Sequence, residues 1–325
     1  FIKEGDPKVI KKYFYVGKME LQKFIKWSNE LNADIIAIEG SNGQSRPIEK
    51  VLRENKMVFY SFKPADVDKY RRATLGENKN NVRDAEATAS FALALDDRKR
   101  LKNYKRVWFP EDGLQLLTRH HEKITSQKTA EINSLWKLVR IASPDLYLLL
   151  KGKEKGVEDV KSSKLDNNSL LNLFSVKPDF SEWKDLNEID LLEAMGGKTY
   201  KGVIERIIKI KKMAHNISPE DSSISLLIKS KASHILFLKQ QLKVIEKELE
   251  KKAGNNKAIQ VLIEEKGVGL NTASKIVAEI VDIRRFAKDD NLASYSGLGR
   301  KTDDTGDSKS EKKNYFFNRR LKNAL

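Results

Sequence analysis

Two acidic residues in the first third of the chain could converge on a metal ion of the kind that a phosphodiester-cleaving enzyme uses, although two carboxylates far apart in sequence are a weak signal by themselves. Glu39 follows the apolar run Asp34–Ile38 (DIIAI), and Asp84 opens an alanine-rich segment. Parallel sheets bind ligands beyond the carboxyl ends of their strands, where Glu39 is expected, and the next unit of the sheet would bring Asp84. Carboxylate oxygens suit Mg²⁺, and a bound metal polarises a phosphate and activates a hydroxyl or water. Each acid also has an ordinary interpretation: Glu39 as a solvated side chain beside a glycine turn, and Asp84 as a favourable charge at a helix N-terminus.

A glycine turn near residue 268 offers a second kind of chemistry. Gly267 and Gly269 flank Val268, and an apolar helix is predicted to follow. This pattern is typical of a helix–hairpin–helix turn, in which free backbone amides hold a nucleic-acid phosphate at the N-terminus of the next helix. A tight turn between two packed helices explains the same pattern equally well.

The C-terminal tail combines basic and aromatic side chains. Basic residues neutralise backbone phosphates, and aromatic rings stack on bases or pack the domain. The tail contains Lys309, Lys312, Lys313, Arg319 and Arg320, interleaved with Tyr315, Phe316 and Phe317. The alternative is a basic face that contacts only water.

Composition narrows the classes of function. The 325 residues include 62 Lys and Arg against 46 Asp and Glu, a net charge of +16. Such a surplus attracts polyanions and favours a nucleic-acid partner. The absence of cysteine, with four histidines that lack metal-ligand spacing, argues against disulfides, a cysteine nucleophile and a zinc enzyme. No apolar stretch is long enough to cross a bilayer and no signal peptide opens the chain, so no membrane partner and a cytoplasmic location are expected.

The elements that would position Glu39 and Asp84 alternate between strand and helix over residues 1–110. The patterns predict strands at Lys12–Lys18, Asp34–Ile38 and Met57–Phe62, and helices at Leu21–Leu31, Pro47–Asn55 and Ala85–Leu95. This alternation indicates an α/β domain, in which helices cover the faces of a largely parallel sheet.

The rest of the chain is predicted to be mainly helical. A long helix over Leu114–Ala142 ends at Ser143-Pro144, and Ile224–Lys252 carries apolar residues at heptad a and d spacing, interrupted by Lys231. We expect residues 111–253 to form a helical connector, with a coiled coil between these two helices or with another subunit. An ordinary helix hairpin would give the same pattern. Residues 254–325 are expected to form a mainly helical C-terminal domain, with a helix over Thr272–Ile283.

Taken in order, these features resemble the DEDD transposases of the insertion sequence 110 type, which include the pilin-gene invertases. The N-terminal half has the strand ending in Glu39 (IIAIEG), a strand end at Lys63-Pro64, and KNNVRDA over Lys79–Ala85, which is similar to the family's K-x-D-x-x-D-A motif. The C-terminal half has the glycine turn, FAKDDNLASYSGL, a Thr-Gly pair at the family's serine–glycine motif, and FFNRRLKNAL. The resemblance covers nearly the whole chain.

The resemblance implies a fold and a reaction. The family's N-terminal domain is RuvC-like (ribonuclease H-like), a mixed sheet with helices that holds Mg²⁺ with four acids; Glu39 matches the second acid and Asp84 the fourth. The second domain supplies a serine that attacks DNA, and Thr305 stands at that position here. Members act on DNA as oligomers guided by a structured bridge RNA. A dimer or tetramer formed through the connector helices is therefore expected.

Three positions depart from the family pattern. Asn81 replaces the third acid, and its neutral amide binds a metal more weakly than a carboxylate. Thr305 replaces the serine, and its methyl group hinders in-line attack. The first acid belongs to a strand that is expected to precede Phe1 and therefore to lie outside this sequence.

Three functions are left open by these departures. The first is a Mg²⁺-dependent transposase or site-specific recombinase, with Glu39, Asn81 and Asp84 at the metal and Thr305 as the nucleophile. The second is a nucleic-acid-binding homologue that keeps the fold and no longer cuts. The third is a RuvC-like structure-specific nuclease that uses metal-activated water. Asn81 counts against both catalytic functions, and the complete second domain counts against a plain nuclease.

Overall fold

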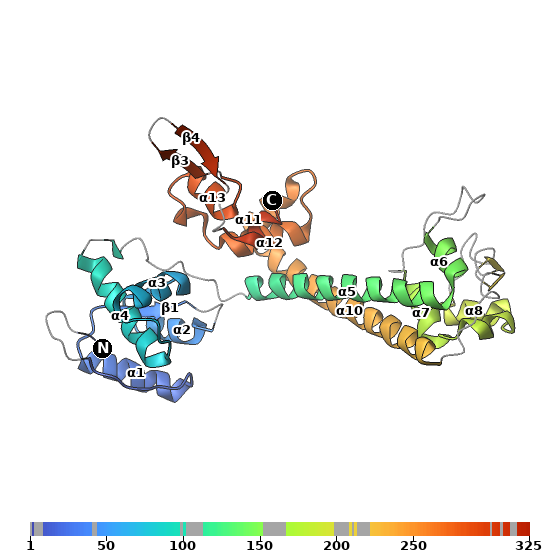
Figure 1. Ribbon diagram of the computed structural model, residues 1–325, viewed down its shortest axis with the longest axis horizontal. Helices are drawn as coiled ribbons and strands as arrows, with labels where there is room; N and C mark the ends of the chain where they lie inside the picture. The colour runs from blue at the N-terminus through green and yellow to red at the C-terminus, as the bar shows by residue number, and fades with distance from the viewer. Residues whose placement is uncertain are drawn as a thin grey trace. The chain divides into compact units, whose positions relative to one another are not determined.

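A computed structural model of the chain divides into two compact units, residues 1–108 and residues 109–325. The structure describes residues 2, 9–40, 44–97, 100–101, 113–151, 167–197, 208–209, 211–212, 222–299, 301–305, 308–312 and 317–325. These residues are mostly helical, with a two-stranded parallel sheet in the first unit and a two-stranded antiparallel sheet in the second (Figure 1). This composition agrees with the predicted combination of α/β and α structure.

The first unit is built around a short parallel sheet. Strand β1 (Ile36–Glu39) pairs with β2 (Phe59–Phe62), so that Glu39 lies opposite Phe62. The helices are α1 (Lys18–Glu30), α2 (Arg46–Glu54), α3 (Pro64–Thr74) and α4 (Asn81–Asp97). Successive strand residues point to opposite faces. Ile36 and Ile38 therefore pack with residues of α1 and α2, whereas Ala37 and Phe62 pack with residues of α3 and α4.

The strand predicted over residues 12–18 does not form. Residues 9–15 have no regular structure, and α1 begins at Lys18. A strand needs a hydrogen-bonded neighbour, and β1 and β2 are the only paired strands among the described residues of this unit. Tyr13 and Tyr15 are accordingly exposed, by 74% and 82%, while Phe14 packs against Phe24 and Trp27.

The second unit is organised by two long helices that lie side by side, α5 (Leu114–Ala142) and α10 (Ser222–Gly254). They are antiparallel, because Glu131 pairs with Lys231 while His121 contacts Glu246. The heptad face of α10 is buried inside this chain, against α5 and α7 (Asn168–Val176). The buried positions are Ile228, Ala232, Ile235, Leu238, Leu242, Ile245, Leu249 and Ala253. Lys231, which interrupts the apolar pattern, reaches the Glu131 carboxylate at 2.7 Å.

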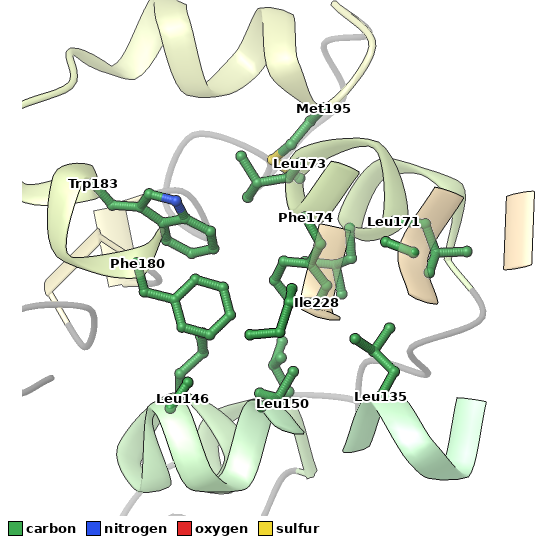
Figure 2. Packing of buried hydrophobic residues seen from close by; sticks show 14 of the residues in the cluster. Leu135, Leu146, Leu150, Leu171, Leu173, Phe174, Phe180, Trp183, Met195 and Ile228 are labelled. Carbon is green, nitrogen blue, oxygen red and sulfur yellow. The ribbon is translucent and has the colours of Figure 1, made fainter. Parts of the chain in front are cut away.

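An aromatic core closes one end of this helix pair (Figure 2). It is formed with α6 (Pro144–Lys151), α7, the 3-10 helix η2 (Phe180–Lys184) and α8 (Glu188–Ala194). Trp183 is fully buried beside Phe174 and Phe180, and its indole N–H donates to the Lys177 carbonyl at 3.0 Å. The Ser143-Pro144 boundary between α5 and α6 is where the sequence predicted it.

Small elements follow α10 in the rest of the second unit. They are α11 (Lys257–Glu264), α12 (Leu270–Ile280), η3 (Ile283–Arg285), α13 (Asp289–Ser296), β3 (Lys301–Thr305), β4 (Ser308–Lys312) and α14 (Arg319–Lys322). Helix α12 packs against both α5 and α10. It ends before the predicted Ile283 because Val281 takes a positive φ of 64°, which terminates the helix. Within the described parts of the chain, no helix is long and apolar enough to span a membrane.

Candidate functional site

Glu39 and Asp84 approach one another in the first unit. Glu39 is the last residue of β1, and Asp84 lies in the first turn of α4. Burial raises the pKa of Glu39, and the negative charge of Asp84 raises it further. The two acids predicted from the sequence are therefore neighbours whose negative charges repel one another.

The strand end that carries Glu39 is held tightly against its neighbour. The Gly40 amide donates to the Phe62 carbonyl at 2.9 Å. A β-carbon on Gly40 would lie 2.9 Å from Ser61 Oγ and 3.2 Å from the Phe62 carbonyl oxygen, closer than real side chains tolerate. A glycine directly after Glu39 thus allows the strand end to stay close to β2.

Arg71 fixes the loop that leads into α4, and no sequence pattern pointed to it. Its side chain is only 2% exposed, and Nη1 donates to the carbonyls of Gly76, Glu77 and Asn78 at 3.0 Å each. Its Nε lies 3.3 Å from Asp84 Oδ1. Buried guanidinium groups need several acceptors, and Arg71 finds them in this loop. The loop and the Asp84 carboxylate are therefore positioned by one cation.

Asn81 is the first residue of α4 and is exposed. It stands three positions before Asp84, a spacing that places both side chains on one face of the helix. The oxygen donors at this site are two carboxylates and one amide, which suit a hard divalent cation. Among the described residues there is no cluster of three or more His, Cys, Asp or Glu side chains that could hold a metal.

The glycine turn in the second unit has the predicted backbone but an acidic surrounding. Gly267 takes a positive φ of 93°, and Gly269 is the N-cap residue of α12. A shallow depression beside Gly269 and the first residues of α12 is also lined by Glu246 and Glu250 of α10. Carboxylates repel a phosphate, so Glu246 and Glu250 would weaken phosphate binding at this turn.

The basic tail is divided between a hairpin and a short helix. Lys309 and Lys312 lie on β4, whereas Lys313 lies outside the described residues. Arg320 donates Nε to Glu122 of α5 at 3.1 Å, so its charge is partly matched within the protein. Arg319 begins α14 and is exposed.

Thr305 is the last residue of β3 and lies opposite Ser308 in the antiparallel register. The sequence did not predict this hairpin. Two residues, Gly306 and Asp307, separate the paired positions, and a two-residue connection that begins with glycine is typical of hairpins. The structure describes the backbone of Thr305 but not its side chain.

Comparison with known families gives two matches. Residues 2–144 match a family model described as a transposase of the DEDD, IS110 type. Residues 259–325 match a model described as the transposase IS116/IS110/IS902 family. The chain belongs to the IS110-type transposase family. A search of curated proteins finds no match to it. Membership of a transposase family implies a DNA partner.

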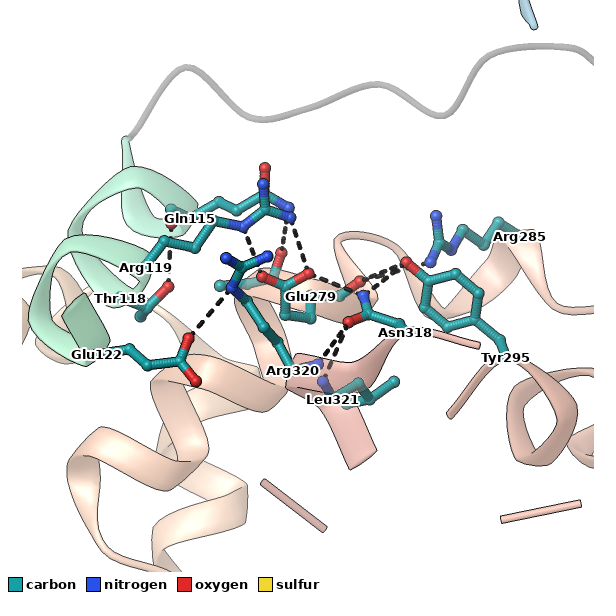
Figure 3. Close-up of polar contacts among 11 residues, drawn as sticks. Gln115, Thr118, Arg119, Glu122, Glu279, Arg285, Tyr295, Asn318, Arg320 and Leu321 are labelled. Atoms are coloured by element: carbon teal, nitrogen blue, oxygen red, sulfur yellow. Dashed lines mark hydrogen bonds and ion pairs between the residues drawn. The ribbon is translucent and has the colours of Figure 1, made fainter. Parts of the chain in front are cut away.

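In this transposase, a buried polar network joins α5 to the C-terminal segment, and sequence reasoning missed it (Figure 3). At its centre is Glu279 of α12, bound by Arg119 and Asn318. Burial alone would raise the pKa of Glu279, but hydrogen bonds from Arg119 and Asn318, together with the charge of Arg119, outweigh it and lower that pKa. The same hydrogen bond raises the pKa of Arg119, because it stabilises the charged guanidinium. The pair is ionised at neutral pH.

Replacing Glu39 by glutamine is expected to stabilise the transposase in the absence of divalent cations. Because the pKa of Glu39 is raised in the folded protein, stability falls as pH rises from the usual carboxyl range through this raised pKa, and stays lower above it. Glutamine removes the repulsion from Asp84. We expect the melting temperature in EDTA at pH 7.5 to rise by about 1–3 °C.

In the same measurement, Mg²⁺ should stabilise the wild type more than it stabilises Glu39→Gln. At ten times its Kd, a cation bound only to the folded protein adds about 1.4 kcal/mol of stability. The wild type should gain this increment, and Glu39→Gln should lose most of it. The exposed Asp97→Asn, at the end of α4, is the matched control and should respond like the wild type. Equal stabilisation of wild type and Glu39→Gln by Mg²⁺ would argue against a cation between Glu39 and Asp84.

Proposed function

We propose that this transposase cleaves and transfers DNA strands in a Mg²⁺-dependent, site-specific reaction guided by a structured bridge RNA. The observation that carries the proposal is the pairing of Glu39 with Asp84 at the end of β1, with the pKa of Glu39 raised by burial and by its neighbour. Its membership of the IS110 transposases supports DNA as the substrate.

The residues that would hold Mg²⁺ are Glu39, Asp84 and, through its amide oxygen, Asn81. Bound there, the cation supplies charge that polarises the scissile phosphate. Arg71 keeps the Asp84 carboxylate in place and balances part of its charge. Because Asn81 contributes no charge, the site has one negative charge fewer than the family pattern, which lowers its affinity for the cation.

The nucleophile in this proposal is the hydroxyl of Thr305. Its oxygen attacks the phosphorus and loses its proton, and the bond from phosphorus to a DNA oxygen breaks as that oxygen takes up a proton. The protein is then joined to the DNA through a phosphodiester. The Thr305 methyl group crowds this attack, so the reaction should be slower than with serine.

Basic side chains of the C-terminal segment would contact the DNA or RNA backbone. Those proposed for this role are Lys309, Lys312, Lys313, Arg319 and Arg320, with the amides near Gly267 and Gly269. The net charge of +16 supports a polyanion partner. Arg320 contributes less than Arg319 because it already pairs with Glu122.

The proposal includes a RuvC-like first unit and an oligomer, a dimer or tetramer, assembled through a coiled coil of the connector helices. The heptad face of α10 already packs within the chain, so a second subunit would use another face. Leu226, Phe237 and Val244 are exposed by 66%, 54% and 64% at spacings of 11 and 7 residues. These spacings place them on one side of the helix, which supports subunit contact there.

A second candidate function is a nucleic-acid-binding homologue that no longer cuts. The observation that favours it is the exposed Asn81 at the start of α4, where an acid would complete the metal site. A RuvC-like nuclease that uses water as the nucleophile is less well supported, because both family models match and the second one covers the C-terminal domain.

The proposed reaction can be tested with the complete protein, its own flanking DNA and co-purified RNA. Strand cleavage should require Mg²⁺ and should stop in EDTA. If DNA binds but no strand is cut at any Mg²⁺ concentration, the non-cutting homologue is the better account.

Binding itself should depend steeply on salt. If about five basic side chains contact phosphates, affinity for duplex DNA should fall roughly 500-fold between 50 and 200 mM monovalent salt. A fluorescence anisotropy titration at four salt concentrations measures this slope. Replacing Lys309 and Lys312 by glutamine should make the slope of log affinity against log salt concentration shallower by about 2, roughly 1 for each lost phosphate contact. A flat response would contradict charge-driven binding.

A further inference from the structure

The carboxylate of Glu279 is bound by residues from two other segments of the chain. From α5, Arg119 donates Nε to Oε1 at 2.8 Å and Nη2 to Oε2 at 3.0 Å. From the C-terminal segment, Asn318 donates Nδ2 to Oε2 at 2.8 Å. The Glu279 side chain is only 3% exposed. A buried, charged junction thus joins α5, α12 and the start of α14 (Figure 3).

Every polar group of Asn318 that can bond within the protein does so. Its amide N–H donates to the Tyr295 carbonyl at 2.7 Å, and Nδ2 also donates to the Tyr295 hydroxyl at 2.9 Å. Its Oδ1 accepts from the amides of Arg320 and Leu321 at 3.1 Å each, which caps α14. Because a carboxylate can only accept, Nδ2 must face Glu279, and this fixes the orientation of the amide.

Asn318 also closes the base of the segment that carries Thr305. The chain leaves α13 after Ser296, forms β3 and β4, and returns to the end of α13 at Asn318, whose amide donates to the Tyr295 carbonyl. A second closure lies beside it: a β-carbon on Gly297, whose φ is +75°, would lie 2.5 Å from Phe317 Cγ. The two ends of the hairpin segment therefore meet at one place, and Glu279 joins that place to α5 and α12.

A junction of this kind fixes the relative orientation of the elements that it joins more than it stabilises the fold. Burying charges costs about as much as their attraction returns, and apolar packing would hold the same elements together. A bidentate carboxylate–guanidinium pair with a third hydrogen bond instead fixes angles and distances. Attack by a hydroxyl on phosphorus depends on such placement, because an error of about 1 Å costs on the order of 100-fold in rate.

We infer that Asn318 and Glu279 are positioning residues for strand cleavage, which hold the base of the Thr305 hairpin in register with α5 and α12. The inference rests on the proposed function, in which the Thr305 hydroxyl attacks DNA. Neither residue takes part in the chemical step. Their effect is on the placement of the hairpin, and so on the rate of attack at saturating DNA.

The variant Asn318→Ser tests the positioning role while leaving the helix cap of α14 in place. Serine caps a helix N-terminus about as well as asparagine, but it is too short to reach Glu279 as well. Single-turnover cleavage at saturating DNA is expected to slow by about 10- to 100-fold, with the Kd for DNA unchanged and the melting temperature within a few degrees of wild type. Hydrogen exchange of the β3 and β4 amides should quicken, while exchange in the middle of α5 and α10 stays the same. Asn323→Ser, at an exposed position in the same segment, is the matched control and should behave like the wild type.

Asn318→Asp provides a second variant with the cap retained. It places a carboxylate against Glu279, so cleavage at pH 7.5 should be slower than in Asn318→Ser. Lowering the pH toward 5.5 should bring its rate closer to that of Asn318→Ser, because one shared proton restores a hydrogen bond between the two carboxyl groups. A structural defect alone would not make the cleavage rates of Asn318→Asp and Asn318→Ser approach one another as the pH falls.

The outcomes separate the inference from the proposed function. Slow cleavage with normal DNA binding and faster hairpin exchange supports the inference. Wild-type cleavage rates in both variants overturn it and leave the proposed function standing. Loss of folding or of DNA binding in Asn318→Ser overturns it in favour of a purely structural role. Absence of cleavage by the wild type overturns the proposed function, and the positioning role with it.

Discussion

Glu39→Gln is expected to lower Mg²⁺-dependent DNA cleavage by at least about 1,000-fold, which corresponds to about 4 kcal/mol of transition-state stabilisation. Glutamine has nearly the same shape as glutamate but lacks the charge that would hold a divalent cation opposite Asp84. The same variant should be more stable than the wild type in EDTA, because the repulsion that raises the pKa of Glu39 is gone. A variant that loses activity while gaining stability cannot have lost activity through unfolding.

The neighbouring substitution Asp84→Asn is expected to lose cleavage to a similar extent, but with a stability cost. Arg71 is buried, and Asp84 is one of its two carboxylate partners, so the neutral amide leaves part of a buried charge unmatched. The loss should be about 1–3 kcal/mol in urea unfolding. Asp97→Asn controls for the removal of a charge from α4. Retention of more than a tenth of wild-type cleavage in either Glu39→Gln or Asp84→Asn would contradict the proposed metal site.

Thr305→Ala is expected to abolish the covalent protein–DNA product, since no hydroxyl remains to attack. Thr305→Ser should form that product faster than the wild type, on the order of tenfold, because the crowding methyl group is removed while the hydroxyl stays. The assay is single-turnover cleavage resolved on denaturing gels. Ser308→Ala is the matched control, because Ser308 lies directly opposite Thr305 in the hairpin. Covalent product from Thr305→Ala would exclude Thr305 as the nucleophile.

The Asn81→Asp and Thr305→Ser double variant separates an active enzyme from one that has lost its chemistry. Both changes restore the residue types of the family pattern, and the aspartate adds a third carboxylate to the proposed metal site, beside Glu39 and Asp84. Cleavage by the double variant alone would identify a disabled transposase that has kept its binding surfaces. Similar cleavage by both proteins would show that an amide at position 81 is sufficient.

Helical elements of this chain were predictable because their signals are local. Leu114–Ala142 ends at Ser143-Pro144, where proline cannot continue a helix and Ser143 is placed to cap the next one, and both ends agree with the structure. The long helix at 222–254 was predictable because its apolar repeat extends over many turns. Its packing partner was left open by the sequence, and the structure places that face against α5 within the same chain.

The errors arose where structure depends on a distant partner. Lys12–Lys18 has the composition of a strand, but no neighbour pairs with it among the described residues, and all of it except Phe14 is exposed. The proximity of Glu39 and Asp84 could be predicted because each lies at the end of a recognisable element. Arg71 and Glu279 were missed because a charged residue in a helix is ordinarily solvated, and only the fold reveals that these two are buried.

The most direct test is a search for covalent attachment by the wild-type protein. The complete transposase, with its co-purified RNA, is incubated with its flanking DNA and Mg²⁺, and the denatured products are digested and mapped by mass spectrometry. The expected result is a nucleotide joined to the peptide that contains Thr305, absent in EDTA and absent in Glu39→Gln. Strand cleavage without any protein–DNA linkage, or linkage at another residue, would contradict the central claim that the Thr305 hydroxyl attacks DNA.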